Sequence, residues 1–98
     1  MTTLEVLSVD NQLMLKGNLT REFITPSIEK QSCRLLSKSI SHINLSQVNM
    51  VDTAGLALLL LLIEVANKAS LSINLVDLPD DLVNLAKLSA VSAFLPVQ

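Results

Sequence analysis

The sequence predicts an α/β domain built on a mixed sheet of four to five strands with three to four helices. Two segments that alternate apolar and polar residues lie close together near the start of the chain, at 4–6 and 13–16. An Ile-Asn-Leu pattern follows at 43–45 and again at 73–75, and a helix-length apolar segment, 53–68, separates the two copies. Alternation is typical of strands with one covered face, and a helical spacer is typical of a parallel connection.

The first two alternating segments are expected to pair as an antiparallel hairpin, because only a short polar break at Asp10-Asn11 separates them. A weaker helical pattern then extends from Thr20 or Thr25 to about Ser39. Both starts stay open, although Pro26 suits a first helical position if Thr25 is the N-cap.

The two Ile-Asn-Leu segments are expected to be parallel strands of one sheet, joined by a right-handed crossover. Asn44 and Asn74 interrupt them, so one face of the sheet should be more solvated than the other. Pro79, with Asp80-Asp81 behind it, suits the first turn of a last helix, where negative charge faces the helix dipole. No linker or low-complexity tract divides the chain, so residues 1–98 are expected to form a single domain.

Composition argues against nucleic acid as a partner. The chain has seven Lys and Arg against nine Asp and Glu, a net charge of −2, and its aromatic residues are Phe23 and Phe94. Neither a basic patch nor a set of stacking platforms is available.

Cys33 is the single cysteine, and the N-terminal sequence MTTLEVLSVDNQ lacks the pattern of a secretory signal. The expected location is therefore the cytoplasm.

The segment VDTAGLALLLLLIE, residues 51–64, is the most apolar stretch. Its ten residues from Ala54 to Ile63 are about half of the ~20 needed to cross a bilayer, so a membrane span is not expected. Asp52 is expected to cap a helix that begins at Thr53. Gly55 costs such a helix up to ~1 kcal/mol relative to alanine, which suggests that something approaches this turn closely.

A helical wheel places one set of residues on a partly apolar, exposed face. Glu64 and Lys68 stand in the favourable i,i+4 order, which marks this face as the solvated one. Two interpretations stay open. Either the whole helix is core, with Asp52 as its cap and Gly55 as a packing requirement, or the face binds a partner. The face holds Thr53, Ala57, Leu60 and Glu64, with Leu61 and Lys68 at its edge.

The pattern Val51-Asp52-Thr53-Ala54-Gly55-Leu56, between an Ile-Asn-Leu strand and a leucine-rich helix, resembles the STAS domain of anti-sigma factor antagonists. The element order, the turn at 16–19 (KGNL) and the closing LSAVSAFLP extend the resemblance over the whole chain. In that family the residue after the aspartate is commonly a serine or threonine that a partner kinase phosphorylates. The resemblance thus implies an anti-sigma factor kinase as partner and phosphorylation at Thr53.

Antagonists usually have a second hydroxyl residue where this chain has Ala54. In this respect, and in Leu-Ala-Lys-Leu at 85–88, the sequence looks more like the MlaB-type STAS subunits of Mla phospholipid ABC transporters. That resemblance implies a non-catalytic cytoplasmic subunit that binds the transporter's MlaF-type ATPase subunit. Through the ATPase it would lie beside the membrane permease at the inner membrane, in a system that maintains outer-membrane lipid asymmetry. The wheel and the motif together predict the partner-binding residues as Asp52, Thr53, Ala54, Gly55, Ala57, Leu60, Leu61 and Glu64.

Groups for catalysis are scarce in the sequence. His42 is the only histidine, there is no cysteine pair for a metal, and Gly17 and Gly55 are too few for a phosphate-binding loop. We therefore expect no enzymatic activity, no cofactor and no metal. A small enzyme or ligand-binding domain that uses His42 remains the alternative from a different class.

Overall fold

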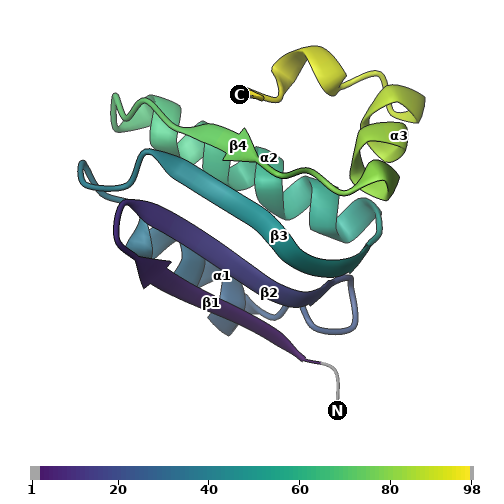
Figure 1. Ribbon diagram of the computed structural model, residues 1–98, viewed down its shortest axis with the longest axis horizontal. Helices are drawn as coiled ribbons and strands as arrows, with labels where there is room; N and C mark the ends of the chain where they lie inside the picture. The colour runs from purple at the N-terminus through teal and green to yellow at the C-terminus, as the bar shows by residue number, and fades with distance from the viewer. Residues whose placement is uncertain (1–2, 98) are drawn as a thin grey trace.

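The computed structural model describes residues 3–97, which form a four-stranded mixed sheet with helices behind it (Figure 1). The strands lie in the order β1-β2-β3-β4, the order in which they follow along the chain. β1 and β2 form the predicted antiparallel hairpin, and β3 pairs in parallel with both β2 and β4. The strands are β1 (Leu4–Val9), β2 (Gln12–Leu19), β3 (His42–Val51) and β4 (Asn74–Val76).

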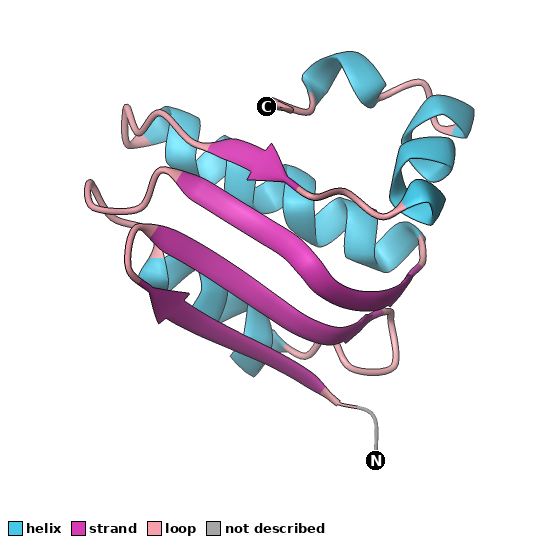
Figure 2. Cartoon of the chain, viewed as in Figure 1, coloured by secondary structure: helices cyan, strands magenta, loops and turns pink. Residues whose placement is uncertain are grey.

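Helices α1 and α2 cover one face of the sheet, and the opposite face is open in the described part of the chain (Figure 2). The buried core lies between this helical layer and the sheet; it includes Leu13 and Ile43 from the strands and Leu59 and Leu62 from α2. This one-sided arrangement confirms the prediction of one more solvated face. The helices are α1 (Pro26–Leu35), α2 (Thr53–Lys68), α3 (Asp80–Leu88) and the short 3₁₀ turn η1 (Ser92–Phe94).

The start of α1 settles the choice between the two predicted positions. The Thr25 hydroxyl accepts a hydrogen bond from the Ile28 amide at 3.2 Å, and Pro26 opens the helix. The predicted end near Ser39 is wrong, because α1 stops at Leu35. Ser37 and Ser39 bond to each other through their hydroxyl groups at 2.8 Å, a local alternative to helix that serines favour.

Strand β3 is longer than its Ile-Asn-Leu pattern suggests. Its core residues are Ile43, Leu45 and then Val48, a spacing that breaks the alternation. The break coincides with two shifts in the register between β2 and β3. One lies between Met14 and Lys16 of β2, and the other between Gly17 and Asn18. As a result Val48 lies in the core although it is out of phase with Ile43 and Leu45.

Strand β4 is short, and the C-terminal segment supports it. The Leu75 amide donates to the Pro96 carbonyl at 2.7 Å, and Leu75 forms an isolated parallel bridge with Val97. The tail therefore takes the place of a fifth strand at this edge. Asp80 and Asp81 lie in the first turn of α3 as predicted, although Pro79 is its N-cap rather than its first residue.

No helix within residues 3–97 combines the length and the apolar character needed to span a membrane.

Gly55 lies where α2 meets the end of β2. A Cβ atom added there would be 2.1 Å from the Leu19 carbonyl oxygen and 2.9 Å from Leu19 Cγ. Since the nearest of these atoms belongs to the backbone, a larger residue requires the helix to move away from the strand.

Gly55→Ala is therefore expected to destabilise the protein by about 2 kcal/mol, because overpacking outweighs the better helix propensity of alanine. Urea denaturation measures the change. The matched control is Ala57→Gly on the exposed side of the same helix, which should lose only the propensity difference of about 1 kcal/mol. A Gly55→Ala protein more stable than the natural one would contradict this account of the contact.

Candidate functional site

The beginning of α2 is fixed by Asp52, as the sequence predicts. One carboxylate oxygen, Oδ1, accepts a hydrogen bond from the Gly55 amide at 3.0 Å, which caps the helix. The other, Oδ2, accepts from the Arg21 amide at 2.9 Å, and the Asp52 amide donates to the Leu19 carbonyl at 3.3 Å. One residue thus connects the end of β2, the loop after it and the first turn of α2.

These contacts favour the ionised form of the Asp52 side chain. Partial burial acts to raise its pKa, but hydrogen bonds from the backbone amides, those of Arg21 and Gly55 foremost, together hold the pKa of Asp52 below its ordinary value. A negative charge therefore persists beside Thr53 at neutral pH.

Helix α2 has one buried and one accessible side. Thr53, Ala57 and Glu64 are exposed, and Leu60 and Leu61 are half-buried. We call these five residues the α2 stripe. The opposite side, including Leu58, Leu59, Leu62 and Ala66, is buried in the core. The core interpretation therefore holds for one side of the helix, and partner binding by the other side stays a prediction.

Three of the predicted partner-binding residues lie off the stripe, and the first of them, Asp52, is the cap of the helix. Ala54 is half-buried, and Gly55 is buried against Leu19. The close approach that Gly55 indicates is thus made by this chain's own β2. The prediction that Gly55 leaves room for a partner is corrected in this respect, because the space beside it is already filled.

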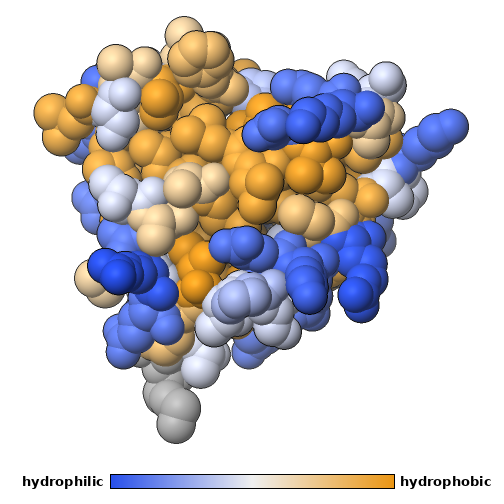
Figure 3. All heavy atoms as spheres, turned by 180° about the vertical axis from the view of Figure 1, so that it is seen from behind, coloured by the Kyte–Doolittle hydropathy of each residue, from blue (hydrophilic) through white to orange (hydrophobic). Residues whose placement is uncertain are grey.

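The helical side of the molecule presents a broad apolar surface (Figure 3). Along the C-terminal half of α2 this surface is hollowed into a groove of about 350 Å³. Sequence reasoning missed the part contributed by Val91 and Phe94, which come from the segment around η1. The available signal was Phe94 itself, an aromatic residue near the chain end that is 68% exposed.

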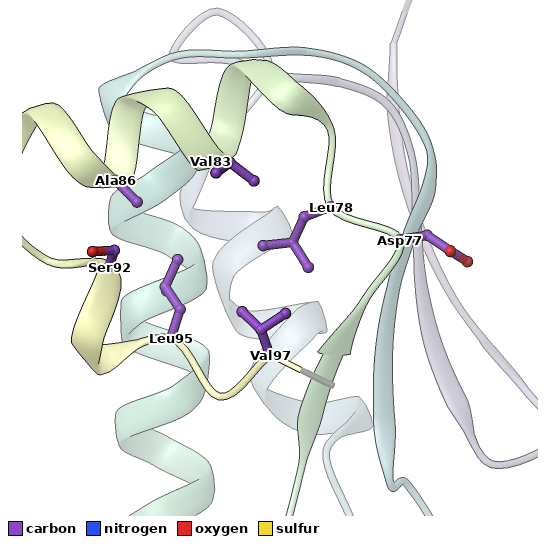
Figure 4. A pocket seen from close by; sticks show the side chains of 7 residues that line it. All are labelled: Asp77, Leu78, Val83, Ala86, Ser92, Leu95 and Val97. Carbon is purple, nitrogen blue, oxygen red and sulfur yellow. The ribbon is translucent and has the colours of Figure 1, made fainter.

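A second cavity, of about 270 Å³, lies between α3, η1 and the residues after β4 (Figure 4). Leu78, Leu95 and Val97 point into it, whereas the Asp77 carboxylate points away. The lining therefore offers apolar contact and brings no pair of reactive groups together.

The remaining candidate groups do not form a catalytic arrangement. His42 Nδ1 lies 2.9 Å from the hydroxyl oxygen of Ser41, which also accepts from the Asn11 amide nitrogen at 2.9 Å, but neither cavity is lined by these residues. Partial burial, and then the negative charge of Glu29, raises the pKa of the Cys33 thiol, the opposite of what a reactive cysteine needs. Within residues 3–97 no three His, Cys, Asp or Glu side chains cluster closely enough to hold a metal ion.

Asp52→Ala is expected to cost about 1–2 kcal/mol of unfolding free energy at neutral pH, because it removes a helix cap and a second backbone contact. The pKa of Asp52 is lowered by folding, so its stabilisation is present above the unfolded carboxyl pKa of about 4 and disappears as the pH falls through the folded value. The difference in unfolding free energy between the natural protein and the variant should therefore become smaller at acidic pH.

Urea denaturation at a series of pH values measures this difference. Glu5→Gln, which removes an exposed carboxylate from β1, is the control and should have little effect. If the difference in unfolding free energy between the natural protein and Asp52→Ala stays constant across the acid range, the carboxylate charge has no part in the cap.

Comparison with known proteins places these features in a family. No protein-family model matches the sequence. The intermembrane phospholipid transport system binding proteins MlaB of Escherichia coli strain K12 and of Shigella flexneri are each 37% identical to this chain over 86 residues. Each match covers 88% of this chain and 87% of the relative.

Among solved structures, the anti-sigma factor antagonist SpoIIAA in its unphosphorylated form has a similar fold. Its TM-score is 0.60 at 11% sequence identity, and the match covers 97% of this chain and 87% of SpoIIAA. At that identity the likeness concerns the fold alone, and it confirms the predicted STAS architecture. With the sequence identity to both MlaB proteins, it follows that the chain belongs to the MlaB family of STAS-domain proteins.

Proposed function

We propose that this chain is the non-catalytic STAS subunit of an Mla-type phospholipid ABC transporter and that it binds the ATPase subunit through the α2 stripe. Its relatives are named as binding proteins of an intermembrane phospholipid transport system. In this proposal the protein is cytoplasmic and lies at the inner membrane through the ATPase and the permease. Lipid movement and ATP hydrolysis, and with them the maintenance of outer-membrane lipid asymmetry, depend on the other chains.

The observation that carries the proposal is the accessible side of an otherwise core-forming helix. Leu60 and Leu61 remain half-buried although the fold has covered the leucines beside them, and Thr53 and Ala57 are exposed on the same side. A partner that covers the two leucines gains apolar burial of roughly 25 cal/mol per Å². The small side chain of Ala57 lets the partner's backbone come close.

A binding subunit of this kind acts by mass action. A protein that binds only the folded, assembled ATPase stabilises that state in proportion to the logarithm of its concentration over its Kd. In this proposal no chemistry on this chain is needed.

Leu60→Asp is expected to weaken binding to the purified ATPase subunit at least 30-fold, about 2 kcal/mol, because it places a charge in the centre of an apolar contact. Isothermal titration calorimetry measures the Kd. Leu7→Asp provides the matched control, since Leu7 is another half-buried leucine but lies in β1 at the far edge of the sheet. If the two folded variants bind the ATPase subunit equally well, the α2 stripe is not part of the interface.

A second candidate function is that of an anti-sigma factor antagonist switched by phosphorylation of Thr53, and the exposure of Thr53 at the start of α2 favours it. A phosphate there adds about −1.5 to −2 charges beside the ionised Asp52. The Gly55 amide could attract a phosphate on Thr53, but it already donates its hydrogen bond to Asp52.

Thr53→Glu and Thr53→Ala separate the two candidates when each variant is used to retain partners from cytoplasm and solubilised membranes. We expect the natural protein to retain an ABC ATPase with its membrane subunits. Thr53→Glu should weaken this retention because it places a charge in the contact. Mass spectrometry identifies the retained proteins and any phosphothreonine at 53. Retention of a soluble kinase-like anti-sigma factor, lost with glutamate and kept with alanine, would favour the switch and contradict the transporter proposal.

A further inference from the structure

We infer that the groove between α2 and η1 receives an apolar side chain from the same ATPase subunit, as a second anchor point beyond the α2 stripe. The inference rests on the proposed function and extends it to residues that no sequence motif marks. The groove holds about 350 Å³, enough for a large side chain, and is lined by Leu60, Ile63, Glu64, Asn67, Lys68, Val91 and Phe94.

The walls of the groove are apolar and incompletely buried. Leu60, Ile63 and Val91 are half-buried, and Phe94 is 68% exposed. A concave site with an aromatic residue at its rim is the surface on which binding energy concentrates in protein interfaces. The fold leaves Phe94 outside the core, so its burial is still to be gained.

The charged side chains at the rim leave the groove without net charge. Glu64 Oε1 and Lys68 Nζ are 3.1 Å apart, one helical turn from each other, and both side chains are largely exposed. The pair satisfies its own charges, so an incoming ion finds no unopposed partner there. An apolar side chain therefore suits the site better than a charged one.

The groove continues the α2 stripe, because Leu60 and Glu64 belong to both. A broad apolar surface, with hydrophilic side chains at its margins and across parts of it, covers this side of the molecule (Figure 3). The backbone groups along α2 are bonded within the helix, so an extended segment cannot add to it as a strand. Recognition here depends on an inserted side chain from the partner already seated on the stripe.

Residues 95–97 of this chain do not fill the groove. Leu95 is buried, the Pro96 carbonyl accepts from the Leu75 amide, and Val97 bridges to β4. Residues 95–97 are thus held at the β4 edge.

Two variants test the inference by opposite means. Phe94→Ser removes the aromatic wall, and Asn67→Trp fills the groove from its exposed rim. Both are expected to weaken binding to the purified ATPase subunit about 10-fold in calorimetric titrations, with thermal unfolding unchanged because both positions are exposed. Val9→Ser is the control, since Val9 is an exposed apolar residue of β1, and should bind like the natural protein.

The outcomes distinguish the inference from the function on which it rests. If Leu60→Asp abolishes binding while Phe94→Ser and Asn67→Trp bind normally, the stripe stands and the groove inference is wrong. If the natural protein does not bind the ATPase subunit at all, the proposed function fails first. A dimer seen by sedimentation velocity and lost in Phe94→Ser, with ATPase binding intact, would assign the groove to a second copy and overturn the inference.

Discussion

The rest of the structure depends on the contact between Leu19 and the first turn of α2. Asp52 donates its amide to the Leu19 carbonyl and accepts the Gly55 amide, while Gly55 packs against Leu19 with no room for a side chain. These restraints fix both the first residue of α2 and the rotation of the helix about its axis. Because one residue of helix corresponds to about 100° of rotation, a slip at this point would exchange buried and exposed leucines along the whole helix.

The accessible stripe is a consequence of this fixed rotation and of the one-sided sheet. With helices on one face only, α2 is an outer layer, and the leucine-rich segment supplies more apolar side chains than the sheet can cover. Leu60 and Leu61 consequently belong partly to the core and partly to the surface. Under the proposed function, substitutions there would affect folding and binding together, which is why a half-buried leucine in the sheet, away from α2, is the relevant reference.

Features that depend on local sequence, and the parallel pairing of the two Ile-Asn-Leu strands, could be predicted, whereas several specific contacts between distant segments could not. The cap at Asp52, the start at Thr53 and the Glu64–Lys68 pair follow from residues within one or two turns. The second half of β3 escaped prediction because register irregularities against β2 break its alternation. Gly55 indicated a close approach but could not identify Leu19, and Phe94 reaches the groove only through tertiary folding.

The stripe and the groove divide the candidate interface into two chemically different ends. At the start of α2 an ionised carboxylate lies beside the exposed Thr53, whereas the groove is apolar and the charges at its rim are paired with each other. From Thr53 to Glu64 the helix rises about 16 Å, so a charge added at Thr53 is beyond a Debye length at physiological ionic strength from the groove. Phosphorylation would therefore act on one end only, and a partner anchored in the groove would be weakened by it rather than fully released.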